Sequence, residues 1–290
     1  MKQIFTLLTF MISTIMTRAQ SDSTQVNATG DTLRIGNIII VRNGSTQSSS
    51  QEKKSNRNES KNYTSGKRSN VSTNWVIVDI GFNNYSDQTN YSSASSFLYN
   101  RPGAAPLGKS DFALNAGKSI NVNIWAFMQK LNLVNHQLFL KYGLGVELHN
   151  FRYKSNISYL EQNPFVSGIA PAPIVFRDSV TFSKNKLAAD YVSVPLMLTF
   201  QSSQSRHKGI SLSVGVSAGY LYSQRNKQVS QERGKQTNGG NFDLEPFKIS
   251  YVGELGLGPI RLYGSYTPKS IYQRGMDIRP YTFGIRLSNW

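Results

Sequence analysis

The sequence predicts an all-β fold, an antiparallel up-and-down transmembrane β-barrel of about eight strands behind a largely disordered N-terminal arm. Three observations carry this prediction. One segment alternates between apolar and small polar side chains, the same alternation recurs along the chain, and the connections between these segments are short and long in turn. Because side chains on a strand point to opposite faces with a period of two, such alternation separates two environments.

Residues 210–222 show the alternation most regularly. Every even position is apolar, as at Val214 and Val216, and nearly every odd position is Ser or Gly, as at Ser213. The small face carries no charge, so this pattern is typical of a strand between lipid and a barrel lumen. A half-buried strand of a soluble sandwich also alternates, and one segment alone does not decide between the two.

Repetition of the pattern favours the membrane barrel. Seven further segments alternate in the same way: residues 76–82, 120–128, 138–148, 192–200, 249–257, 260–266 and 281–287. Together with residues 210–222 they give the even strand number that bacterial barrels show.

The lengths of the connections give an independent test. Short links are expected near residues 131–135, 202–208 and 258–259, and long polar ones at 83–117, 154–189, 223–246 and 269–279. Membrane barrels have short periplasmic turns and long extracellular loops, whereas a soluble sandwich has no reason to place every long loop at one end.

The N-terminal region differs from the rest of the chain. Residues 1–19 combine Lys2, an apolar stretch and a small residue, Ala19, which predicts a secretory signal peptide and export to the outer membrane. Residues 20–73 are too polar to bury a core and predict a largely disordered periplasmic arm, with a short strand or hairpin arm at 32–41. The barrel is expected to occupy residues 74–290.

Composition excludes several classes of function. The chain has no cysteine, which excludes a disulfide framework, a thiol nucleophile and a lipid anchor on Cys. Its formal net charge is +16, yet the basic residues are scattered through loops and linker without a nucleic-acid-binding motif. We therefore expect no nucleic-acid partner and take the anionic headgroups of outer-membrane lipid as the counterions.

Charged side chains occupy inward-facing positions of the predicted strands. Because eight strands enclose a lumen that side chains fill, these charges should pair with one another in a structural network rather than line a ligand site or proton path. Trp125 and Tyr263 should help to fill the same space. The three acidic and three basic residues are Asp79, Lys141, Glu147, Glu254, Arg261 and Arg286.

A catalytic or metal site has little support in the sequence. His149 lies two residues from Glu147 on the same inferred inward face, which makes a serine hydrolase conceivable, but no nucleophile motif accompanies the pair. The chain has neither thiols nor clustered imidazoles, so no metal is expected, and no cofactor is expected either.

Aromatic residues mark the edge of the predicted bilayer region. Those at strand ends that adjoin long loops should form an interfacial girdle, because core packing alone does not explain why they gather at one end. They are Phe82, Tyr220, Tyr222, Tyr266 and Tyr281.

Residues 191–198 read Tyr-Val-Ser-Val-Pro-Leu-Met-Leu, which resembles a strand of the Bacteroidetes outer-membrane β-barrel proteins of the PorT-like group. Residues 79–84, 114–119 and 142–147 are similar to that group's first strand, the entry to its second and its third strand. The resemblance covers residues 74–290 and implies an outer-membrane barrel without a catalytic site.

Two positions depart from this pattern. Pro195 cannot donate a hydrogen bond to a strand ladder, so we expect a bulge or register break there. The terminal Trp290 is out of phase with Phe283, Ile285 and Leu287, so either a bulge near residues 288–289 restores the phase or the assembly signal of this barrel is imperfect.

The expected function is non-enzymatic: a membrane-integral scaffold or interaction module, which the resemblance connects with export or envelope machinery. A protein partner would bind the N-terminal arm or the long extracellular loops. A porin-like channel for small solutes and a lipid-modifying barrel enzyme are the alternatives.

Overall fold

The computed structural model describes residues 32–35, 38–41, 69–94, 97–165, 172–202 and 209–288. The chain divides into two compact units, residues 1–64 and 65–290. In the first unit, β1 (Thr32–Ile35) and β2 (Ile38–Val41) pair in antiparallel fashion, within the range where the sequence predicts a strand or hairpin arm. The predicted signal peptide and the rest of the predicted arm up to residue 68 lie outside the described residues.

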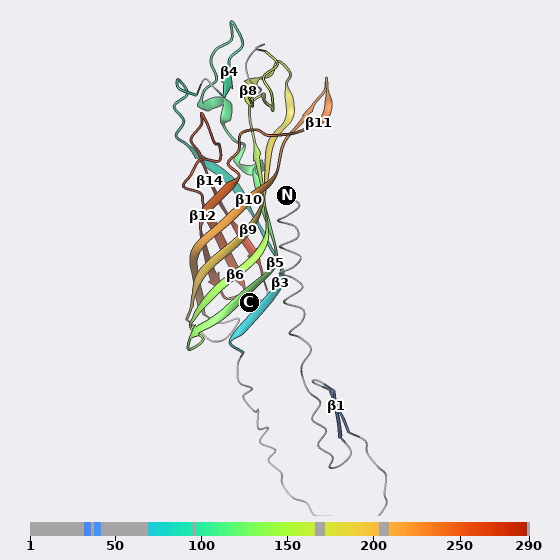
Figure 1. The fold of residues 1–290 in the computed structure, drawn as a ribbon, viewed down its shortest axis with the longest axis vertical. Coiled ribbons are helices and arrows are strands. Elements are labelled where there is room, and N and C mark those ends of the chain that lie inside the picture. The colour runs from blue at the N-terminus through green and yellow to red at the C-terminus, as the bar shows by residue number, and fades with distance from the viewer. Residues whose placement is uncertain are drawn as a thin grey trace, which may run out of the picture. The chain divides into compact units, whose positions relative to one another are not determined.

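The second unit contains a closed antiparallel β-barrel (Figure 1), which confirms the predicted fold class. Each barrel strand pairs with the barrel strand that precedes it in the chain and with the one that follows it. The ring closes where the last strand, β14, pairs with the first, β3. The eight barrel strands are β3 (Val71–Asp87), β5 (Ile120–Val134), β6 (Leu138–Arg152), β9 (Phe182–Gln201), β10 (Ile210–Ser230), β12 (Phe247–Leu257), β13 (Ile260–Tyr266) and β14 (Ile278–Leu287).

The two faces of β10 meet different surroundings, as the alternation predicts. Val214 is 55% exposed on the outside of the ring, whereas its neighbour Ser213 is 1% exposed on the inside. The Ser213 hydroxyl accepts a hydrogen bond from Thr199 Oγ1 on β9 at 2.8 Å. The small inward side chains therefore bond to one another while the apolar ones project outward.

Tight turns connect strands at one end of the barrel. Asn135 and His136 both have positive φ angles, 47° and 55°, and the Gln137 N–H donates to the Val134 carbonyl at 2.9 Å. Two central residues with positive φ match the right-handed twist of the flanking strands, as in a type I′ turn. Strand β5 thus continues to Val134, beyond the start of the predicted link at residue 131.

An irregularity in β3 changes which side chains face outward. Trp75 pairs with Phe127 and Ile77 pairs with Trp125, which leaves Val76 outside the pairing with a φ of 53°. Trp75 and Val76 are therefore both exposed, at 68% and 71%. Strand β3 begins at Val71, and in its first residues the odd positions face outward, whereas from Val76 on the even positions do. The alternation in the sequence therefore becomes regular only at Val76, although the strand starts five residues earlier.

The predicted bulge or local register break at Pro195 is wrong, because neither ladder of β9 shifts its register there. Strands β6 and β9 pair Tyr142 with Leu196 and Gly145 with Ser193, which is the same register on both sides of the proline. The pairs between these positions are missing from the ladder, because proline has no N–H to donate. The predicted bulge before Trp290 falls at the edge of the described residues, since residues 289–290 lie outside them.

The long connections at the other end of the barrel fold into a structure that we call the cap, formed by the described residues of the four connections β3–β5, β6–β9, β10–β12 and β13–β14. The sequence suggested polar loops there. Instead, β4 (Leu98–Tyr99), β8 (Ile174–Arg177) and β7 (Ile157–Leu160) form a three-stranded sheet, and β11 (Gly234–Gly239) extends β10 as a hairpin. Two short 3₁₀ helices, η1 (Lys109–Phe112) and η2 (Ala116–Lys118), precede β5.

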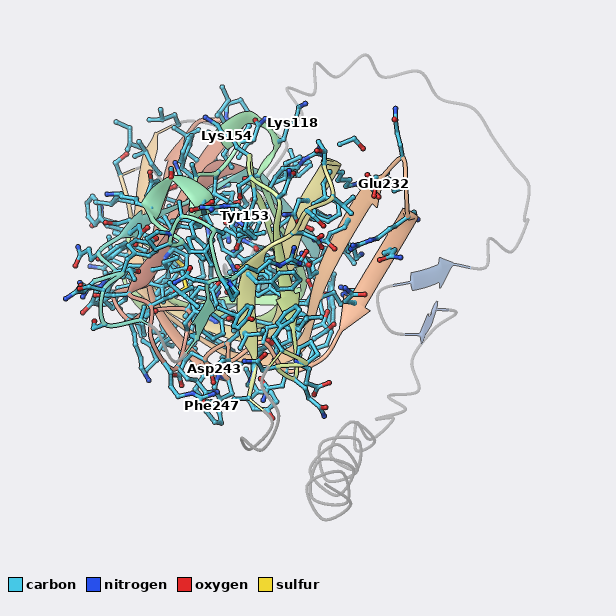
Figure 2. All side chains as sticks on the ribbon, turned by 90° about the horizontal axis from the view of Figure 1, so that it is seen from above. Lys118, Tyr153, Lys154, Glu232, Asp243 and Phe247 are labelled. Atoms are coloured by element: carbon cyan, nitrogen blue, oxygen red, sulfur yellow. The ribbon has the colours of Figure 1, made fainter. Side chains whose placement is uncertain are left out.

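Buried aromatic residues make the core of the cap. The hydroxyl of Tyr159 lies 2.7 Å from those of Tyr153 and Tyr272, so the β6–β9 and β13–β14 connections meet in one hydrogen-bonded chain. Burial raises the pKa of Tyr153 to about 12, which keeps this hydroxyl protonated at neutral pH. Figure 2, viewed from above, shows Tyr153 amid the packed side chains and Glu232 at the outer hairpin. The cap therefore covers the barrel mouth with packed side chains.

Candidate functional site

The barrel interior brings all six predicted inward charges into a buried space. They come from five strands, β3, β6, β12, β13 and β14. None is more than 6% exposed: Asp79, Lys141, Glu147, Glu254, Arg261 and Arg286. Buried charges need partners, because desolvation of an unpaired charge is costly.

Glu254 is the centre of the first group of ion pairs. Its Oε2 atom lies 2.5 Å from Lys141 Nζ and 2.5 Å from Arg286 Nη1. Its Oε1 atom lies 3.2 Å from Arg261 Nη1. One carboxylate thus contacts three basic side chains from three other strands, and its excess of positive neighbours requires a second acid.

Asp79 is that second acid. Arg286 donates from Nε to Asp79 Oδ1 and from Nη2 to Oδ2, both at 2.7 Å. Trp125 Nε1 and Asn123 Nδ2 also donate to Oδ2, at 2.8 and 3.1 Å. Bidentate geometry and neutral donors together satisfy the lone pairs of the buried carboxylate.

Glu147 forms a second group, nearer to the cap, with a partner that the sequence prediction missed. Lys248 Nζ lies 2.5 Å from Glu147 Oε2, and Ser217 Oγ donates to Oε1 at 2.9 Å. Lys248 precedes the alternating segment 249–257 by one residue and shares the parity of the inward Ser250. Extending the alternation by one residue would have found it.

The geometry around His149 does not match a serine hydrolase. Its Nε2 atom lies 3.3 Å from Glu147 Oε2 and 2.9 Å from Lys248 Nζ, and its Nδ1 atom lies 3.1 Å from Asn83 Oδ1. The nearby Ser217 hydroxyl donates to the carboxylate and not to the imidazole. A nucleophile needs a base within hydrogen-bond reach, and no Ser–His hydrogen bond occurs among the described residues.

The described residues leave little space inside the ring. A cavity of about 20 Å³ borders Glu147 and Arg286, room for about one water molecule. The buried Tyr263 side chain extends from β13 to β5, where its hydroxyl donates to Asn121 Oδ1 at 2.6 Å. Gly81 makes room for it, because a Cβ atom at this position would lie 2.6 Å from the Tyr263 hydroxyl.

The aromatic residues expected in the girdle lie on the outside of the ring. Phe82, Tyr220, Tyr222 and Tyr266 are exposed, whereas Tyr281 is partly buried. Tyr266 is directly opposite Tyr281 and, on its other side, opposite Tyr251, and Tyr220 is opposite Phe247. The alternation rule applied to these strand ends would also have identified Tyr251 and Phe247.

Metal ligation and helical membrane spans are absent from the part of the chain that the structure describes. Its His, Asp and Glu side chains form no group of three or more suited to a metal ion. No helix among these residues has the length and apolar character to cross a membrane.

A closed, side-chain-filled barrel with an apolar outer face is the architecture of an outer-membrane β-barrel protein. The chain belongs to the outer membrane protein beta-barrel domain family, whose model matches residues 69–268. No curated protein sequence matches the chain. A solved structure of Ail, the attachment invasion locus protein of Yersinia pestis, in complex with the heparin analogue sucrose octasulfate, is 10% identical with a TM-score of 0.29, and the match covers 74% of this chain and 98% of that chain. A likeness at this level carries no argument about function.

Proposed function

We propose that this protein is a non-enzymatic scaffold or interaction module of the outer membrane, in which the barrel anchors a folded cap on the cell surface. The orientation follows from the rule that long loops of these barrels are extracellular. The single observation that carries the proposal is the cap itself, because its connections bury a common aromatic core instead of remaining separate polar loops. A rigid surface on a rigid anchor suits recognition of a partner.

A small-solute channel is the first alternative, and the interior argues against it. The Glu254–Lys141 ion pair crosses the lumen between β12 and β6, the Asp79–Arg286 pair lies on its inner wall, and the tyrosine-rich core of the cap lies over one mouth. A lipid-modifying enzyme is the second alternative. The hydrogen bonds of His149 and Ser217 do not assemble a nucleophile with its base.

The resemblance to the PorT-like group supports a more specific proposal, namely a role in export or envelope machinery. In that case the partner binds the extracellular cap or the predicted arm at residues 20–73. Secretion by the predicted signal peptide at residues 1–19 would deliver the chain to the periplasm for barrel insertion.

Quantitative cross-linking in native outer membranes tests the proposal. We would compare the full mature chain with one variant lacking residues 21–68, which leaves β3 intact, and with another in which the exposed hairpin residues 232–238 are replaced by Gly-Ser. We expect one partner in stoichiometric amount whose yield falls at least tenfold in one of the variants. Equal cross-linking to all abundant membrane proteins in the three chains would contradict a specific interaction.

A lipid-turnover assay addresses the enzymatic alternative directly. Purified protein in phospholipid vesicles should release no fatty acid or lysolipid above a heat-unfolded control. Turnover that disappears in a Ser217→Ala variant with an intact fold would replace the scaffold by an enzyme.

A further inference from the structure

Strands β6, β9 and β10 continue beyond the lipid-facing part of the barrel and carry basic side chains on their outer wall. On β9 the outward apolar residues run from Val192 to Phe200. Beyond Val192, the alternate positions Asn185 and Leu187 are buried inward, so Lys184 and Lys186 face outward. We call the outward basic set the basic wall: Arg152, Lys184, Lys186, Arg225, Lys227 and Lys235.

Strand register places three of these charges in one row. Lys186 on β9 is directly opposite Arg152 on β6 and, on its other side, directly opposite Lys227 on β10. Adjacent strands lie about 4.8 Å apart, so three like charges line up across roughly 10 Å. Directly opposed like charges destabilise a sheet, which makes this row unfavourable unless an anion binds it.

The protein itself supplies little compensation. Arg225 pairs with Asp190, but no ion pair among the described residues includes Arg152, Lys186 or Lys227. Lys186 Nζ donates at 2.6 Å to the neutral Asn150 Oδ1. Burial and the nearby charges of Lys227, Lys184 and Arg225 lower the pKa of Lys186 to about 8.

The height of the row on the wall indicates what kind of anion reaches it. Lys186 lies six residues beyond Val192, the last outward apolar residue of β9. At about 3.3 Å per residue on a strand tilted by about 40°, this places Lys186 roughly 15 Å above Val192. The headgroup layer of a plain phospholipid bilayer extends only about 5–8 Å beyond the hydrocarbon region, so a lipid that reaches this height carries a larger, sugar-containing headgroup. Its acyl chains would lie against the apolar residues below.

We propose that Arg152, Lys186 and Lys227 bind phosphate groups on the headgroup of an outer-leaflet lipid. The row matches an extended headgroup with more than one phosphate, since three cationic groups spread over three strands can contact two separated anions. This site lies on the outer wall and is independent of the function proposed for the cap.

Lipid binding by the folded, full mature chain in detergent micelles tests the site. The probe is a diphosphorylated glucosamine-based lipid, counted by native mass spectrometry, with the dephosphorylated lipid as the comparison. We expect the phosphorylated lipid to bind at least tenfold more tightly, and Lys186→Gln with Lys227→Gln to remove most of that preference. The matched control, Lys109→Gln with Lys269→Gln, removes two charges from exposed cap residues and should keep it.

Folding of each variant is checked by its heat-dependent mobility in gels. Without lipid the double glutamine variant should be at least as stable as the native chain, because the repulsion in the row is relieved. Lys186→Arg with Lys227→Arg should retain the preference. Equal binding of the two lipids by the native chain would overturn the proposal. Tighter binding of a soluble polyanion such as heparin, with no dependence on acyl chains, would overturn it as well.

Discussion

Arg286 and Asp79 form a bidentate ion pair across the seam where the last barrel strand meets the first. The two residues are directly opposite in the register of β14 and β3, and both of their N–O contacts measure 2.7 Å. The pair therefore joins segments that are 207 residues apart in the chain. A strand seam that closes the sheet removes its free edges, and this ion pair lies on its inner face.

Removing one partner of this pair should destabilise the barrel strongly. We expect Asp79→Ala to lower the free energy of unfolding by about 3–5 kcal/mol, because Arg286 would remain buried with less compensation. Urea titration of the protein in lipid vesicles measures the change. The control is Asp277→Ala, which removes a partly exposed ion pair with Arg279 and should cost about 1 kcal/mol or less.

The double variant Asp79→Ala with Arg286→Met should lose less stability than the sum of its single variants. Removing both charges removes the unpaired one, so coupling between the two positions is expected. Additive losses would show that the pair contributes nothing specific at the seam.

The barrel should carry no large ionic current. Trp125, Tyr263 and the charge pairs of Glu254 occupy the lumen, and eight strands leave no aqueous pore beyond such side chains. Planar-bilayer recording of the purified protein is the measurement. Stable conductance of porin size that persists after deletion of loop residues would require a larger, open barrel.

The two faces of β10 should respond differently to charge. Val214→Arg places a charge in lipid and should destabilise the barrel by about 2–4 kcal/mol near the bilayer midplane. Ser213→Arg should act instead by crowding the lumen beside Thr199. Labels at Val214 and Val216 should be quenched by lipid-borne quenchers, and labels at Ser213 should not; equal quenching would contradict the assigned facing.

The tyrosine chain in the cap should stabilise the cap locally. Tyr159→Phe removes the hydroxyl that bonds to both Tyr153 and Tyr272, so these two buried hydroxyls each lose a partner. We expect the free energy of unfolding of the cap to fall by about 1–3 kcal/mol. Hydrogen exchange of the backbone should rise in β7 and β8 while the barrel strands stay protected. Tyr99→Phe is the control in the same sheet, and comparable exchange in both variants would argue against a role for the chain.

Acid should loosen the β10–β11 hairpin before it affects the barrel. Burial alone would raise the pKa of Asp178, but hydrogen bonds from Val180 N–H, Ser158 and Arg233 hold this pKa below its ordinary value. A carboxyl with a lowered folded-state pKa stabilises the fold above its unfolded pKa, and that stability is lost as pH falls through the folded value. Arg233 lies at the hairpin turn, so its link to Asp178 should weaken below about pH 4.

Proteolysis near Arg233 at pH 6 and at pH 3, with an acid-active protease, measures this release. Asp178→Asn should show at pH 6 the susceptibility that the native chain shows only in acid. Cleavage that is independent of pH in both chains would contradict the link.

Local patterns in the chain were sufficient to predict the strands and the facing of most side chains. Parity alone assigns Asp79 and Glu254 to the inside, because a strand has only two faces. The same rule fails where the backbone inserts an irregularity, as at Val76, since nothing in the local sequence marks the change of phase there. The expectation at Pro195, which rested on the missing N–H of proline and not on parity, was also wrong, because the ladder loses pairs there but the register holds.

By itself, the sequence determined that this chain forms a closed antiparallel barrel with an apolar exterior, because side-chain alternation and loop length are local properties. Only the tertiary structure decided which charges meet: Glu254 with three bases, Glu147 with Lys248, and Lys186 between Arg152 and Lys227. It also decided that four separate connections share one buried core. Such contacts depend on the register and closure of the ring, which bring together residues far apart in the chain and leave no local signal.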